Sequence, residues 1–154
     1  MVPRGLPRLT AFHIGLGVAL IAVNAVAGLY GAFAWWRHVN APGFWPLLRI
    51  GQALVLVQAL DGVILLLLGK ELPQLHLIYG LVPIAVSFVA EQLRLTAAET
   101  VLQQRDLEGR ADVEKLAPAE QQELVTVILR REMGVMAASA VVVALLGVRA
   151  AGGL

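Results

Sequence analysis

Four long stretches of this chain are almost free of charged residues, and they limit the possible folds more than any other feature. They cover residues 9–36, 50–69, 72–90 and 133–148. An α-helix needs about 20 apolar residues to cross the hydrocarbon core of a bilayer. The first three stretches reach about that length, and the fourth reaches it if Arg149 extends its charged head to the interface. The sequence therefore predicts an all-α integral membrane four-helix bundle.

The composition supports this class of protein. Of the 154 residues, 58% are hydrophobic and 15% are charged, and the mean hydropathy is +0.76. So little chain lies outside the apolar stretches that we predict a single membrane domain, residues 1–154, with the lipid bilayer as its first partner. The absence of cysteine excludes disulfides, iron–sulfur ligation and a thiol nucleophile. The net charge of +1 gives no reason to expect nucleic-acid binding.

The connections between the apolar stretches predict how the helices are joined. Two connections are short, so consecutive helices should be antiparallel neighbours, and residues 96–131 predict a helical hairpin outside the membrane between the third and fourth helices. Eight of the twelve Lys and Arg residues lie on the side of this long loop. The positive-inside rule therefore predicts a cytoplasmic long loop and external termini, as in a protein of a bacterial inner membrane. The basic residues on the external side are Arg4, Arg8, Lys70 and Arg149.

An apolar segment that begins with histidine occurs twice, 63 residues apart. Seven of the fifteen residues from His13 to Ala27 are identical to those from His76 to Ala90, and Gly17 corresponds to Gly80. A repeat of this kind indicates two copies of one structural unit. We predict two tandem helical hairpins, residues 9–69 and 73–154, related by an axis along the membrane normal.

The two repeated histidines are the main candidates for a site. They begin parallel helices on the same side of the membrane, so they should lie at equal depth. Helical spacing places each histidine on the same face as a glycine and a polar residue, which is the kind of face that turns toward other helices. Two facing imidazoles can act as the axial ligands of one haem, and a glycine one turn away leaves room for a flat macrocycle. The predicted haem-binding residues are His13 and His76 as iron ligands, Gly17 and Gly80 beside them, and Arg8 and Lys70 near the propionates.

With this layout and histidine pair, the chain resembles four-helix b-type cytochromes and, more loosely, one half of a haem A synthase. The resemblance implies a haem b that serves electron transfer or haem handling. In the synthase family a carboxylate and an arginine accompany a haem histidine, whereas Ile14 follows His13 here and Leu77 follows His76. We therefore assign no catalytic residues and do not expect catalytic haem modification; the sequence leaves other enzymatic activity open and favours a non-enzymatic role. Structural, solvated histidines at the interface remain the alternative.

Asp61 is the other notable residue, because a carboxylate near the middle of a membrane is costly unless it is neutral, paired or hydrated. We predict a buried polar layer that fixes the helix register, made of Asn24, Gln58, Asp61, Ser87 and Ser139. The functional alternative is a small proton-coupled carrier that uses Asp61.

A non-catalytic accessory or assembly subunit of a larger membrane complex is a further alternative. It rests on the lack of a full catalytic set and on a stripe of small residues on the first helix, at positions 27, 28, 31 and 32. Such stripes allow close helix contact. The partners would then be other membrane subunits or a second copy of the chain.

Overall fold

The computed structural model describes residues 6–71 and 73–152. Its elements are α1 (Leu6–Arg37), α2 (Phe44–Leu67), α3 (Gln74–Gln103), α4 (Arg110–Val113) and α5 (Pro118–Ala151). Within the described residues, the four predicted long apolar helices are confirmed as α1, α2, α3 and α5, each long and apolar enough to cross a membrane. Arg4 and the last two residues of the predicted second repeat lie outside the described part.

The helix ends follow from local sequence. After α2, Gly69 adopts φ +82°, a left-handed conformation that costs glycine little. Pro73 then precedes α3, and Pro118 is the first residue of α5, where its missing N–H would have no partner within the helix. The Glu120 carboxylate accepts the Ala117 N–H at 3.0 Å and closes the first turn of α5.

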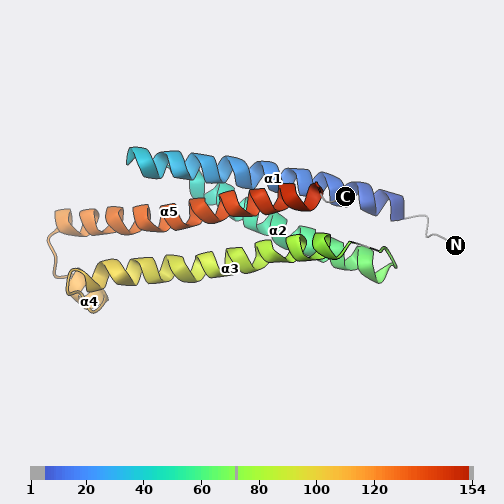
Figure 1. Cartoon of the computed structure of the whole chain (residues 1–154). Helices are drawn as coiled ribbons and strands as arrows, with labels where there is room; N and C mark the ends of the chain where they lie inside the picture. The colour runs from blue at the N-terminus through green and yellow to red at the C-terminus, as the bar shows by residue number, and fades with distance from the viewer. Residues whose placement is uncertain (1–5, 72, 153–154) are drawn as a thin grey trace.

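The four long helices run side by side, and the described ends of the chain lie at the same end of the molecule (Figure 1). The most extensive contacts are those of α5 with α1 and with α3, followed by α1 with α2. By comparison α2 touches α3 little, and α1 and α3 have no extensive contact. The two helices that carry the repeated histidines are therefore held apart by their neighbours.

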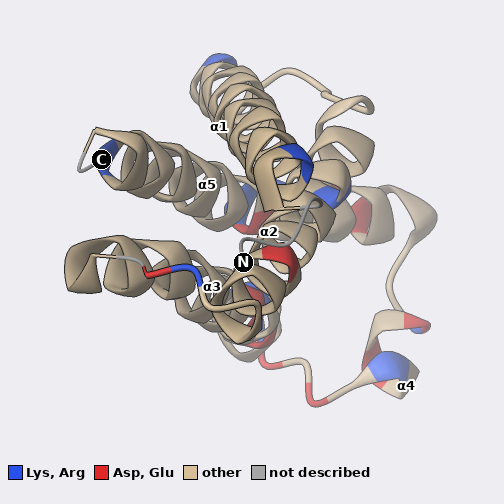
Figure 2. Ribbon diagram, turned by 90° about the vertical axis from the view of Figure 1, so that its right-hand side faces the viewer, with Lys and Arg blue, Asp and Glu red and all other residues tan. Residues whose placement is uncertain are grey.

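The long connection lies at the opposite end. There α3 and α5 continue past the end of α1, and α4 joins them (Figure 1). Charged residues gather on α4 and its adjoining loops, away from the four long helices (Figure 2). In this connection the Lys115 ammonium and the Glu108 N–H both donate to Asp112, and they lower the pKa of that carboxyl.

Glycine allows α1 to approach α5 closely. A Cβ placed on Gly28 would lie 2.6 Å from Val141 Cγ2 and 2.8 Å from the Val141 backbone nitrogen. One turn later, a Cβ on Gly31 would overlap the Phe44 ring. Ala27, Gly28 and Gly31 are all buried. Most of the small-residue stripe of α1 is therefore used inside this chain and is not free to receive a partner.

An ion-pair cluster joins three helices nearer the α4 end. Glu91 of α3 accepts from Arg49 of α2 and, at 3.0 Å, from Arg94 of its own helix. Arg94 also reaches Glu132 of α5 at 3.4 Å and lies over the Trp45 ring, 5.9 Å from its centroid. The cluster links α2 to α3, which otherwise share little contact.

The packing at Gly28 gives a direct test. Gly28→Ala should destabilise the protein by about 1–3 kcal/mol, because the new methyl group meets the Val141 backbone and forces α1 from α5. The measurement is the free energy of unfolding in detergent. Gly15→Ala is the matched control on the same helix, since a Cβ there meets nothing within 4 Å. Equal stability of the two variants would contradict the α1–α5 packing.

Candidate functional site

A histidine and a carboxylate from neighbouring helices form the centre of the candidate site. His13 of α1 and Asp61 of α2 approach to 2.8 Å between Nδ1 and Oδ2. Their side chains are only 14% and 8% exposed. An ionised carboxylate only accepts hydrogen bonds, so with Asp61 ionised the proton of this pair lies on His13 Nδ1. The bond holds the imidazole in one orientation.

Gln58 lies one turn before Asp61 on α2. It determines the hydrogen-bonding role of Nε2, the other ring nitrogen of His13. The Gln58 Nε2 atom donates to the His13 carbonyl oxygen at 3.2 Å and lies 3.0 Å from His13 Nε2. An amide nitrogen can only donate, so His13 Nε2 must accept. His13 is thus assigned as the neutral Nδ1–H tautomer, with the Nε2 lone pair covered by Gln58. The Gln58 Oε1 atom is buried without a partner among the described residues.

His76 of α3 faces His13 across the space between their helices. Its Nδ1 donates to the carbonyl oxygen of Ala150 at 3.2 Å, near the end of α5. That bond leaves Nε2 as the nitrogen with the lone pair. The centroids of the two imidazole rings are 6.0 Å apart, and the ring planes are inclined by 49°. The two histidines thus meet at one depth.

A cavity of about 130 Å³ is lined by both histidines and otherwise mainly by apolar side chains. The two glycines beside it differ in how much free space surrounds them. A Cβ on Gly80 would meet nothing within 4 Å, whereas a Cβ on Gly17 would lie 3.3 Å from Gln58 Nε2. The space provided by Gly80 is open, and the space provided by Gly17 holds the Gln58 amide.

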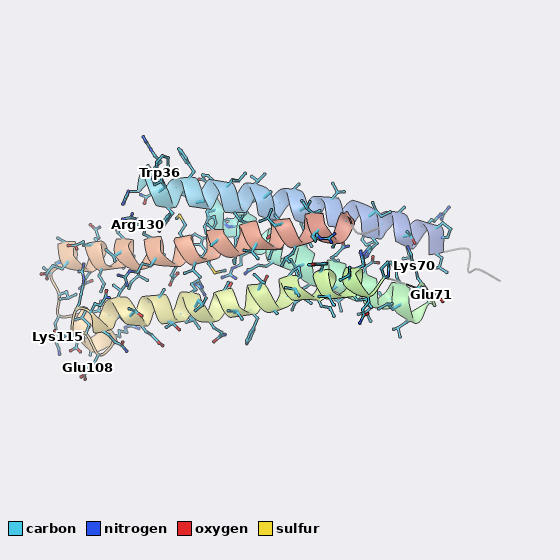
Figure 3. The ribbon with its side chains drawn as sticks, viewed as in Figure 1. Trp36, Lys70, Glu71, Glu108, Lys115 and Arg130 are labelled. Carbon is cyan, nitrogen blue, oxygen red and sulfur yellow. The ribbon has the colours of Figure 1, made fainter. Side chains whose placement is uncertain are left out.

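The two basic residues predicted to meet propionates lie near this end of the molecule. Lys70 Nζ donates to Thr10 Oγ1 at 3.0 Å, which joins the α2–α3 turn to α1. Arg8 is exposed on the first turn of α1. Figure 3 shows Lys70 and Glu71 at the end of the molecule opposite Arg130.

The residues of the predicted polar layer lie in separate places. Gln58 and Asp61 belong to the histidine site. Asn24 is buried elsewhere, where its Nδ2 donates to the Leu20 and Gly51 carbonyls at 2.9 and 3.4 Å. Ser139 donates to Met136 of its own helix at 2.8 Å, and Ser87 is half-buried on α3. The structure brings two of the five residues together.

Sequence reasoning did not associate Asp61 with His13. Counting residues from the helix ends places Asp61 farther along α2 than His13 lies along α1. This count does not give the position along the bundle, because α2 crosses the other helices obliquely (Figure 1). The helical spacing of Gln58 and Asp61 did carry a signal, because it placed both side chains on one face of α2. The Ala150 carbonyl left no signal in the sequence, since every residue has one.

Comparison of the chain with protein-family models, with curated proteins and with solved structures finds no match.

The donor atoms of the site fit a metal held between two imidazoles. Histidines that bind metals commonly donate their other N–H to a carboxylate or a backbone carbonyl. Asp61 and Ala150 accept these two bonds here. Because Asp61 is bound to Nδ1, it cannot share a metal with Nε2 of the same ring.

The space at the site is smaller than a cofactor usually needs. Cofactor sites usually measure about 300–1,000 Å³, and this cavity measures about 130 Å³. A macrocycle therefore needs the Gln58 amide to leave His13 and the helices α1 and α3 to separate.

Proposed function

We propose that the chain is an integral membrane protein in which α1, α2, α3 and α5 span the bilayer as a four-helix bundle. The four helices contain 32, 24, 30 and 34 residues, and each exceeds the roughly 20 needed for a crossing. Large apolar side chains are exposed on all four, as lipid contact requires. Examples are Leu29, Leu60, Phe88 and Leu145, which are 64–68% exposed.

The side of the membrane follows from the basic residues. Among the described residues, those on the α4 end outnumber those on the other end by eight to three. The α4 end is therefore assigned to the cytoplasm, and the histidine site to the external side of a bacterial inner membrane.

The chain lacks cysteine, so this topology can be tested by labelling single introduced cysteines in intact cells. Asn40→Cys and Gly109→Cys should be protected from an impermeant maleimide, because both lie at the α4 end. Lys70→Cys should react, because it lies at the opposite end. Reaction of only one of the first two positions would disprove the arrangement, and reversal of all three would reverse the orientation.

Within this bundle we infer that His13 and His76 bind one haem b for electron transfer or haem handling. The observation that carries this inference is the approach of the two rings to 6.0 Å between centroids, each with its Nδ1 already bonded. Bound haem b supplies an iron that changes its oxidation state by one electron. The Asp61 carboxylate holds the His13 ring in its orientation. The Ala150 carbonyl orients His76 in the same way.

Two features favour the opening that a macrocycle requires. First, α1 and α3 share no extensive contact, so their separation breaks little direct packing. Second, the Gln58 side chain is incompletely bonded, because its Oε1 has no partner among the described residues. An unsatisfied buried polar atom costs about 1–3 kcal/mol. Moving Gln58 away from His13 removes that cost if the amide reaches water or a polar group.

The test of haem binding is an absorption spectrum of the protein purified after expression with ample haem. The oxidised and reduced spectra should show the Soret and α bands of a low-spin, six-coordinate haem. His13→Ala and His76→Ala should each abolish the low-spin spectrum, because one axial ligand is lost. His38→Ala is the matched control, since His38 lies at the other end of α1 and should leave the spectrum unchanged.

A wild-type protein without a Soret band would defeat the haem proposal. Stoichiometric co-purification with other membrane proteins would then favour an accessory subunit. The packing of most of the small-residue stripe against α5 and Phe44 weakens that alternative, because it removes the surface that suggested it.

A proton-coupled carrier is the second candidate, and the buried His13–Asp61 pair favours it. Two adjacent titratable groups can exchange a proton, which an isolated carboxylate cannot do. Asp61→Asn keeps the shape of the side chain and removes its charge. If the chain is a carrier, this variant should reduce proton-coupled solute uptake into proteoliposomes by at least tenfold. Unchanged uptake would eliminate the carrier.

A further inference from the structure

A second cavity lies at the α4 end of the molecule, remote from the histidines. It measures about 560 Å³ and is formed by the end of α1, the α1–α2 turn and the part of α5 that faces them. Its volume is within the range of about 300–1,000 Å³ found for small-molecule sites. The lining is mainly apolar and includes the rings of Trp35 and Trp45.

The ionisable side chains that line this cavity are Arg130 and His38, and no Asp or Glu lines it. Arg130 lies in the space between the end of α1 and α5 (Figure 3). Its Nε is buried and has no hydrogen-bond partner among residues 6–71 and 73–152. The neighbouring Arg131 instead donates to Gln104 at 3.1 Å. A guanidinium with a buried, unpaired N–H is costly unless an anion accepts from it.

The position of the cavity indicates what kind of anion would bind. Trp35 and Trp36 end the apolar part of α1, and tryptophan is enriched where a membrane meets water. Trp35 lies close against α5, because a Cβ on Gly134 would be 2.8 Å from its Nε1. A cavity with one guanidinium and a mainly apolar wall at this level matches a molecule with an anionic head and an apolar body. Arginine binds phosphate oxygens in a fixed fork geometry.

We propose that this cavity binds the phosphate group of an anionic phospholipid from the cytoplasmic leaflet. Arg130 holds the phosphate, and the apolar wall accepts the glycerol and the first part of the acyl chains. The proposal rests on the proposed membrane insertion and orientation, but it is independent of haem, because the two sites lie at opposite ends of the helices.

The test is a titration of the detergent-purified protein with short-chain phosphatidylglycerol, followed by tryptophan fluorescence. Two of the three tryptophans, Trp35 and Trp45, line this cavity. Wild-type protein should show saturable binding that is at least tenfold tighter than binding of short-chain phosphatidylcholine. Arg130→Gln should weaken the binding of phosphatidylglycerol about tenfold or more. Arg130→Lys should weaken this binding less, because lysine keeps the positive charge and loses only the fork geometry of the guanidinium.

Arg131→Gln is the matched control, since it removes the neighbouring positive charge outside the cavity and should change affinity less than threefold. Equal loss in Arg130→Gln and Arg131→Gln would mean a general charge effect and would overturn the proposal. Equal binding of the two lipids would also overturn it. If inorganic phosphate bound as tightly as phosphatidylglycerol, the cavity would be a site for free anions and the lipid proposal would be wrong. A lipid titration of this kind is unaffected by the presence or absence of a Soret band.

Discussion

The close approach of α1 to α5 determines where the other helices can lie. At Gly28 the backbone of α1 comes so near Val141 that even a methyl group would collide with it. Because α5 also packs along α3, it stands between the two helices that carry the histidines. In the described part of the chain, those helices share no extensive contact, and His13 and His76 approach each other at one end. This packing accounts for the cavity that His13 and His76 line.

The two buried polar residues Asp61 and Asn24 are satisfied at separate places, not in one continuous layer. Asp61 is bonded to His13, and Asn24 is bonded to two backbone carbonyls at a different place. A polar group without water must find its partner within the protein, and a nearby partner is enough. The pairing also determines chemistry, because Asp61 and Gln58 together leave His13 neutral with its lone pair on Nε2.

Much of the architecture could be predicted from the sequence because it depends on one-dimensional properties. Apolar run length predicted the four helices, and the parallel placement of His13 and His76 followed from counting turns. The contact of Asp61 with His13 could not be predicted in this way, because it depends on the oblique path of α2. The position of Gln58 beside Gly17 was missed for a related reason: a glycine indicates space but not what fills it.

The histidine site is rigid on one side and adjustable on the other. Each Nδ1 is fixed by an acceptor on a neighbouring helix, so the orientation of both rings is set before any ligand arrives. The Nε2 side of His13 is covered only by the Gln58 amide, and a hydrogen bond of this kind contributes about 1 kcal/mol net. A ligand that bonds to Nε2 therefore competes with one weak contact while it uses the fixed orientation of both rings. The orientation of each ring is thus pre-organised for a ligand, while the space between α1 and α3 still has to open for a macrocycle.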